Sequence, residues 1–313
     1  MPDKINKTYD VAIIGSGPAG LSASIYASRY RLSNIVIGEM LGGSISDAHR
    51  VCNYPGFIDT PGIDLSQNFL KQAEHLGGEF SQELVTKILK KDNLFLLETE
   101  SQNTYYSKTI ILTLGSSRNK LGLPNEDFFL GKGVSYCATC DAMFFREKRV
   151  AVVGGSNAAT MSASMLSDIA SEVYIIYRGT ELRGDQVWIE DVKEKSNIKI
   201  IYSTTVVSLE GGSKLERIKL SNRYNNSEYL EIDGLFIEIG SVPNADLAQQ
   251  IGVKLDRENY IVVSEDQSTS LEGIWAAGDC TNSSNKFSQV VTAASEGAIA
   301  ANSIFAFIKK KTV

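Results

Sequence analysis

The alternation of apolar and polar positions near the start of the chain predicts a strand, a turn, a helix and a second strand. Residues 9–14 form an apolar run typical of a buried strand, and residues 15–20 are a glycine-rich turn. A helical pattern follows over 21–30, and a second short apolar run covers 34–37. This order is that of a nucleotide-binding α/β unit.

The same order of elements returns in the middle of the chain. An apolar strand is predicted over 150–153 and a turn over 154–159, followed by a helix to about residue 170 and a strand over 173–177. The chain therefore contains an internal repeat of a nucleotide-binding unit, which differs from the short repeats of a solenoid.

The first glycine turn has the residues that a dinucleotide needs. Gly15 permits the tight turn, Gly17 lets the backbone approach a pyrophosphate, and Gly20 lets the helix pack closely on the strand. Glu39 follows about twenty residues later, where a carboxylate can accept hydrogen bonds from a ribose.

Two breaks in the pattern indicate how the chain is divided. Strands are predicted over 94–99 and 109–114, a turn over 115–117, and a glycine and proline break over 240–244. We expect hinges at these two breaks, which would let one domain rotate relative to the other. The predicted fold is α/β with two Rossmann-like, three-layer nucleotide-binding domains, the second inserted in the first. The domains are residues 1–117 with 244–313, and residues 118–243.

Composition and charge exclude several classes of protein. The chain has 313 residues, of which 43% are hydrophobic and 22% are charged, as in globular proteins. With 31 basic and 37 acidic residues, a net charge of −6 does not favour a nucleic-acid partner. We also see no signal peptide and no apolar run of membrane-spanning length. A cytoplasmic protein with no membrane partner is expected.

The pair Cys137 and Cys140 is the strongest chemical signal. Two thiols at this spacing can close a small disulfide ring, and the adjacent Asp141 can move protons during thiol exchange. A helix predicted over 142–148 would place the cysteines at its N-terminus, where a thiolate is stabilised.

The remaining cysteines and the histidines carry no predicted chemistry. Cys52 and Cys280 stand alone and are interpreted as small buried residues. His49 and His75 do not occur at metal-ligand spacing with a second cysteine pair, so no metal site is predicted.

Four motifs together resemble those of the low-molecular-weight thioredoxin reductases, over essentially the whole chain. They are Gly15–Gly20, Asn53–Gly56, Gly133–Asp141 and Ala276–Asp279. The resemblance implies an FAD domain built from the two chain ends, an inserted NADPH-type domain that carries the cysteines, and a homodimer. It further implies that Cys140 contacts the flavin, that Asp141 is the acid/base, and that domain rotation exposes the dithiol to thioredoxin. Cys140 is then the cysteine expected to attack thioredoxin.

The resemblance also extends the list of residues expected to bind FAD. Asn53 would face the flavin edge, Asp279 would bind the ribityl or pyrophosphate region, and Gln289 and Val290 would present backbone amides to the flavin. The full expected set is Gly15, Ser16, Gly17, Pro18, Ala19, Gly20, Glu39, Gly43, Ser44, Asn53, Gly115, Gly278, Asp279, Ser288, Gln289 and Val290.

The expected NADPH site departs from the family pattern. Ser156 stands where the family has glycine, Tyr177 where it has histidine, and Gly179 where it has arginine. A side chain at 156 crowds the pyrophosphate, and loss of an arginine contact to a 2′-phosphate costs about 1.5 to 3 kcal/mol. A further change, Ser288 in place of a common arginine, lies near the expected flavin. The residual site would comprise Gly154, Ser156, Asn157, Ala158, Arg178 and Arg183.

Three functions are compatible with this pattern. The favoured one is a thioredoxin reductase whose flavin takes electrons from reduced ferredoxin, as in the ferredoxin-linked branch of the family. The first alternative is an NADPH-dependent thioredoxin reductase with a weakened nucleotide site. The second is a non-catalytic FAD-binding redox sensor, which would show no turnover with any donor and thioredoxin.

Overall fold

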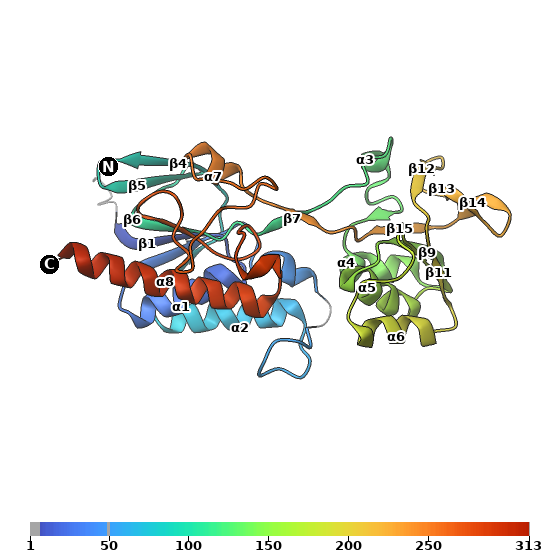
Figure 1. Ribbon diagram of the computed structural model, residues 1–313, viewed down its shortest axis with the longest axis horizontal. Coiled ribbons are helices and arrows are strands. Elements are labelled where there is room, and N and C mark those ends of the chain that lie inside the picture. Colours follow the sequence, from blue (N-terminus) through green and yellow to red (C-terminus); the bar gives the residue numbers. More distant parts are fainter. Residues whose placement is uncertain (1–6, 49–50, 313) are drawn as a thin grey trace. The chain divides into compact units, whose positions relative to one another are not determined.

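The computed structural model describes residues 7–48 and 51–312, and the chain divides into two compact units. The first unit combines the two ends of the chain, Met1–Ser117 and Pro243–Val313, and the second is Arg118–Val242. In Figure 1 the blue and red ends of the chain intermix in the first unit, whereas the second unit is coloured green to orange. The predicted α/β fold class is confirmed.

The first unit is built on a seven-stranded sheet with the order β3-β2-β1-β6-β5-β4 and with β17 also paired to β6. β1 pairs in parallel with β2 and β6, while the first half of β6 pairs antiparallel with β5. The strands are β1 Thr8–Ile14, β2 Asn34–Ile37, β3 Glu79–Ser81, β4 Val85–Lys91, β5 Leu94–Thr99, β6 Thr104–Leu112 and β17 Ile274–Ala276. The helices are α1 Pro18–Arg29, α2 Gly62–His75, α7 Asp246–Gln250 and α8 Val290–Thr312.

Helix α1 begins three residues earlier than the sequence pattern predicts. The glycine turn was expected to last to Gly20, but the helix starts at Pro18, with Gly17 as its N-cap residue. Proline suits the first helical position because its fixed φ fits the helix and its missing N–H is not needed there. The predicted strands 34–37 and 94–99 are confirmed at both ends.

Helix α8 is packed against α1 by small residues. A side chain on Gly297 would collide with the carbonyl oxygen of Ala19, so the two helices are in close backbone contact. Among the described residues one helix segment, Val290–Lys311, is long and apolar enough to cross a membrane by length and composition. The prediction of no such run is therefore wrong for α8, whose Ala300, Ala301 and Ile304 are buried in the core.

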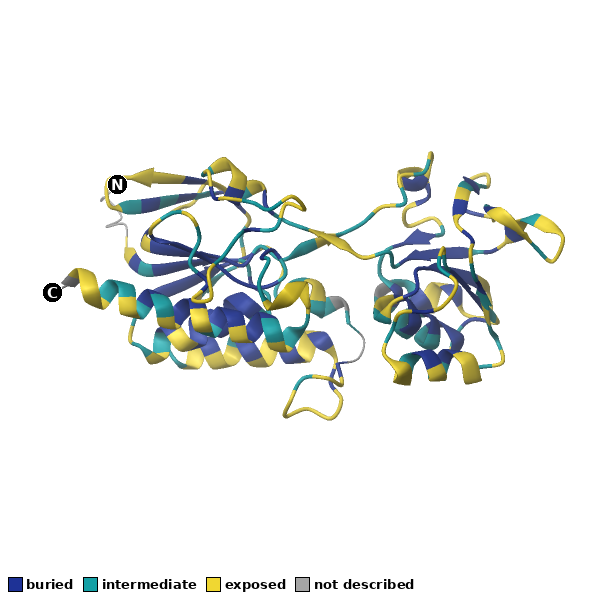
Figure 2. Ribbon diagram, in the orientation of Figure 1, coloured by how far each residue is buried: buried dark blue, intermediate teal, exposed yellow. Residues whose placement is uncertain are grey.

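The second unit has a five-stranded parallel sheet with the order β11-β10-β9-β15-β8 and a three-stranded antiparallel sheet, β12-β13-β14. Figure 2 shows the buried strands of each main sheet in dark blue. The strands are β8 Val134–Ser135, β9 Arg149–Val153, β10 Glu172–Ile176, β11 Ile198–Ile201, β12 Val206–Glu210, β13 Arg217–Tyr224, β14 Ser227–Glu231 and β15 Gly234–Ile237. The helices are α3 Glu126–Phe129, α4 Ala138–Asp141, α5 Asn157–Ser167 and α6 Gln186–Glu194.

The predicted turn at 115–117 and the predicted break at 240–244 both contain strands. Ser116–Arg118 forms β7 and Ser241–Pro243 forms β16, and these two strands pair with each other. Predicting a turn at 116–117 was therefore wrong. Single short strands of this kind have too few residues to show a period-2 pattern, and their partner lies far away in the sequence.

Candidate functional site

A cavity of about 600 Å³ opens in the first unit where β1, β2 and β6 end. The carboxyl ends of parallel strands are the usual ligand crevice of such sheets. Except for Gly20 and Asn53, every residue expected to bind FAD lines this cavity. These residues are Gly15, Ser16, Gly17, Pro18, Ala19, Glu39, Gly43, Ser44, Gly115, Gly278, Asp279, Ser288, Gln289 and Val290.

Different physical constraints apply at the three glycines of the first turn. Gly15 has φ +115°, and a side chain there would also collide with the carbonyl oxygen of Thr113. A side chain on Gly20 would collide with the carbonyl oxygen of Gly15. Gly17 has an ordinary φ of −77°, and its Cβ would meet only the carbonyl oxygen of Gly42, at 3.7 Å.

Gly17 is therefore required neither by backbone conformation nor by protein packing. Its missing side chain leaves the cavity open at the N-terminus of α1, where helix amides and dipole attract an anion. An open cradle of this kind fits the pyrophosphate of the expected FAD.

The segment from the end of β3 to the start of β4 was not predicted to line the site. Glu83, Leu84 and Val85 form part of the cavity wall, and Glu83 is held by several donors. Burial opposes ionisation of Glu83, but hydrogen bonds from Ser81, Thr99, Tyr105 and Asn103 outweigh it and lower its pKa to about 2. Ser81, Thr99 and Tyr105 come from β3, β5 and β6, and Asn103 directly precedes β6, so sequence periodicity offered no signal for this network.

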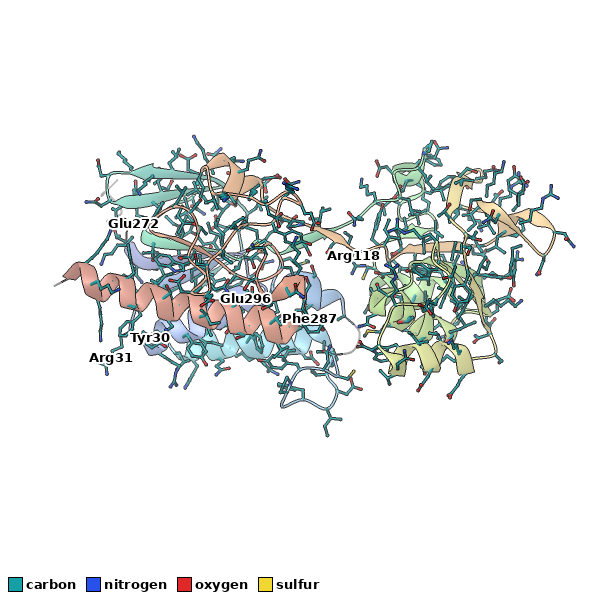
Figure 3. The ribbon with its side chains drawn as sticks, in the orientation of Figure 1. Tyr30, Arg31, Arg118, Glu272, Phe287 and Glu296 are labelled. Atoms are coloured by element: carbon teal, nitrogen blue, oxygen red, sulfur yellow. The ribbon has the colours of Figure 1, made fainter. Side chains whose placement is uncertain are left out.

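Asp279 lies in the cavity beside a second, buried carboxylate. Glu296, on α8, accepts hydrogen bonds from the Gly278 amide at 2.7 Å and the Ser284 hydroxyl at 2.5 Å. Figure 3 labels Glu296 on the α8 ribbon. Burial, and then the charge of Glu296, raise the pKa of Asp279 to about 6.

This raised pKa predicts a pH dependence of stability in the FAD-free protein. In the folded protein the Asp279 carboxyl has a pKa of about 6, above its ordinary value of 3.8, so the folded state holds the proton more tightly than the unfolded state does. The free energy of unfolding therefore falls as the pH rises from about 4 to about 6. We expect Asp279→Asn to gain up to about 3 kcal/mol over the wild type across that interval. Urea unfolding at pH 4 and at pH 7 measures the difference. The exposed Asp64→Asn is the control, and an equal change in both variants would contradict the expectation.

Asn53 and Gln289 come from distant parts of the chain and bind each other. The Asn53 side-chain amide donates to Gln289 Oε1 at 2.9 Å. Gln289 directly precedes α8, and Thr292 Oγ1 accepts its backbone N–H at 3.2 Å. Asn53 therefore does not line the cavity itself, but it is hydrogen-bonded to Gln289, which does.

The cysteine pair lies in the second unit at a very short helix. Cys137 is disulfide-bonded, and its amide donates to the Ser135 hydroxyl at 3.0 Å. Cys140 is within α4, directly before Asp141; the side chain of Cys140 lies outside what the structure describes. The helix predicted over 142–148 is wrong, because only a 3-10 turn, Ala142–Phe145, follows α4.

The structure has Cys52 and Cys280 as free cysteines. Cys280 is buried and Cys52 is exposed, so the prediction of burial is wrong for Cys52. In the described part of the chain no group of three or more His, Cys, Asp or Glu side chains could hold a metal ion. His49 lies outside the described residues.

The second glycine turn precedes α5 with Ser156 as N-cap residue. Ser156 has φ −106°, so serine is accommodated without backbone strain, and its exposed hydroxyl makes no cap hydrogen bond. Gly154 has φ +148° and opens the turn, while the exposed Ala158 lies in the first turn of α5. Arg178 and Arg183 are also exposed.

Asn157, the first residue of α5, is bonded within the chain. Its side-chain amide donates to Asp185 Oδ2 at 3.0 Å, and its Oδ1 accepts the Asp185 amide at 2.6 Å. The side chain of Asn157 is therefore engaged by the loop that precedes α6, which the sequence pattern did not indicate.

The comparisons with known proteins agree over nearly the whole chain. Residues 9–297 match the family model of the pyridine nucleotide-disulphide oxidoreductases. The chain is 38% identical to thioredoxin reductase of Mycoplasma genitalium over 297 residues, which cover 93% of each chain.

Solved structures show the same similarity. The crystal structure of Lactococcus lactis thioredoxin reductase in the FR conformation matches with a TM-score of 0.91 and 30% identity, over 96% of this chain and 99% of the other. A ferredoxin-flavin thioredoxin reductase from Clostridium acetobutylicum matches with a TM-score of 0.54 and 31% identity, over 98% and 99% of the two chains.

Proposed function

This chain belongs to the pyridine nucleotide-disulphide oxidoreductase family, and from that premise we propose that it is an FAD-dependent thioredoxin reductase. Residues 1–117 and 244–313 bind FAD, and the inserted residues 118–243 carry the redox-active Cys137 and Cys140. The observation that carries the proposal is the disulfide at Cys137 in a chain whose other unit has an open pyrophosphate cradle at Gly17.

The chain's own residues divide the work between cofactor binding and thiol exchange. The turn at Gly15–Gly20 and the N-terminus of α1 hold the pyrophosphate, and Glu39 accepts hydrogen bonds from the ribose. FAD, when bound there, supplies the electron relay between an external donor and the disulfide.

The cysteine pair passes two electrons to the partner protein. Reduction breaks the Cys137–Cys140 bond and leaves two thiols. The Cys140 thiolate then attacks the thioredoxin disulfide, forms a mixed disulfide and releases one thioredoxin thiolate, which takes up a proton. Cys137 attacks the mixed disulfide, which restores its own disulfide and frees reduced thioredoxin. Asp141, next to the pair in sequence, supplies and accepts the protons.

We further propose that reduced ferredoxin is the electron donor, that the enzyme is a homodimer, and that it acts in the cytoplasm. The donor assignment is supported by Ser156 and Gly179, which replace the glycine and arginine expected for NADPH. The Clostridium acetobutylicum protein of the same fold, which is named a ferredoxin-flavin thioredoxin reductase, also supports this assignment. An NADPH enzyme that relies on Arg178 and Arg183 is the alternative, because both side chains remain exposed in the second unit.

Flavin absorbance under anaerobic conditions tests the donor. The FAD-loaded protein is mixed separately with NADPH, NADH and reduced ferredoxin, and thioredoxin reduction is followed in parallel. We expect ferredoxin to bleach the flavin and both nicotinamides to leave its colour unchanged. Rapid bleaching by micromolar NADPH would refute the ferredoxin assignment. No thioredoxin reduction with any donor would favour the redox sensor.

A further inference from the structure

The internal repeat allows the two glycine turns to be compared position by position. In the first unit Ser16 follows the opening glycine, and Gly38 follows the last residue of β2; a side chain on Gly38 would collide with Ser16. In the second unit the small and the larger residue have changed places. Gly155 stands at the position of Ser16, and Tyr177, directly after the last residue of β10, stands at the position of Gly38.

This exchange places an aromatic ring against the second turn. A Cβ on Gly155 would lie 2.5 Å from Cδ2 of Tyr177, and a Cβ on Gly179 would lie 2.6 Å from Cε1 of the same ring. Neither glycine has a positive φ. Both are therefore required by contact with the ring and not by backbone conformation.

The position of the ring corresponds to the adenosine end of a dinucleotide site. The equivalents of Gly155, Tyr177, Arg178 and Gly179 in the first unit are Ser16, Gly38, Glu39 and Met40, and all four line the cavity that we assign to FAD. The ring is only partly exposed, and Gly155 beneath it is buried.

The loop beyond the ring is also tied to the turn. The Arg183 amide donates to the carbonyl oxygen of Gly155 at 2.6 Å, so residues 177–183 close back on the glycine turn. Tyr177 thus has backbone on two sides, which restricts its movement out of the crevice.

We propose that Tyr177, seated between Gly155 and Gly179, fills the adenosine end of the nucleotide crevice in the second unit and is the residue that excludes pyridine dinucleotides. Gly179 then does not only lack the charge of an arginine. It also makes room for the Tyr177 ring, because a side chain at position 179 would collide with the ring in its present place. The inference deepens the ferredoxin assignment and rests on it, since it names the residue that rejects the other donor.

Calorimetric titration of FAD-loaded protein with NADP⁺ tests the proposal. Tyr177→Ala removes the ring, and Ser156→Gly restores the close approach of a pyrophosphate. The matched control, Tyr177→Phe with Ser156→Gly, keeps the ring. We expect no saturable binding by the wild type or by the Phe control at millimolar NADP⁺, and binding at least about tenfold tighter by Tyr177→Ala with Ser156→Gly.

The outcomes separate this inference from the proposed function. Micromolar binding of NADP⁺ by the wild type, or no tighter binding by the Ala variant than by the folded Phe control, would overturn the role of Tyr177. Thermal unfolding of each variant identifies loss of the fold, and Tyr177→Leu replaces Tyr177→Ala if that variant is unfolded. Ferredoxin-driven thioredoxin reduction by the wild type alone decides the proposed function, because it involves no change at Tyr177.

Discussion

Cys140→Ser is expected to lower thioredoxin reduction by at least about a thousandfold, as removal of a reacting nucleophile does in other enzymes. A serine hydroxyl does not form a disulfide or exchange with one, so electrons cannot pass from the pair to the partner. We expect FAD binding to be unchanged, because the described residues that line the cavity assigned to FAD belong to the first unit, whereas the cysteine pair lies in the second. Steady-state thioredoxin reduction and the flavin-to-protein ratio measure the two effects.

Cys52→Ser is the matched control for this variant. Cys52 is a free, exposed cysteine of the first unit, so its replacement should leave thioredoxin reduction within about twofold of the wild type. The disulfide mechanism would be ruled out by a Cys140→Ser enzyme that reduces thioredoxin at the wild-type rate.

Gly17→Val is expected to weaken FAD binding by about a hundredfold or more, since overpacking a well-fitted site costs about 3 kcal/mol at the upper end of its usual range. The backbone at Gly17, with φ −77° and ψ −177°, is extended and accepts valine without strain. The new side chain points to the place where the pyrophosphate would approach the N-terminus of α1. Titration of FAD-free protein with FAD, followed by flavin fluorescence, measures the affinity.

Gly212→Val separates a cofactor effect from a general effect of β-branched substitution. Gly212 also lacks a positive φ, and its Cβ would meet only Glu216 Oε1, at 3.9 Å, in the second unit. We expect unchanged FAD affinity in this variant. Should Gly17→Val bind FAD as tightly as Gly212→Val does, the pyrophosphate would have to lie elsewhere.

Much of the candidate site is encoded in short stretches of sequence. The turn from Gly15 to Gly20 and the Cys137–Cys140 spacing are local patterns, because a tight turn and a small disulfide ring both involve residues close along the chain. The ends of the strands 34–37 and 94–99 were predicted for the same reason, since each is a short apolar run with clear boundaries.

The predicted ends of two helices were wrong, because neighbouring residues give competing signals there. The sequence pattern predicts a glycine turn that lasts to Gly20, whereas in the structure Pro18, in the middle of that turn, begins α1. The helix of the second repeat, α5, ends at Ser167 and not near residue 170, because the following residues turn toward β10. Such ends depend on capping and on contacts with the next strand, which periodicity does not contain.

The sequence alone determined the fold class, the repeat of two α/β units with glycine turns and the position of the cysteine pair that we propose to be redox-active. Strand and helix periods, glycine turns and thiol spacing are all properties of neighbouring residues. Tertiary structure decided which distant residues share one site. Only the folded chain brings Asn53 to Gln289, Glu296 to Gly278, and Tyr177 between two glycines. The physical reason is that these contacts depend on how sheets and helices pack, and packing joins residues whose separation along the chain follows no period.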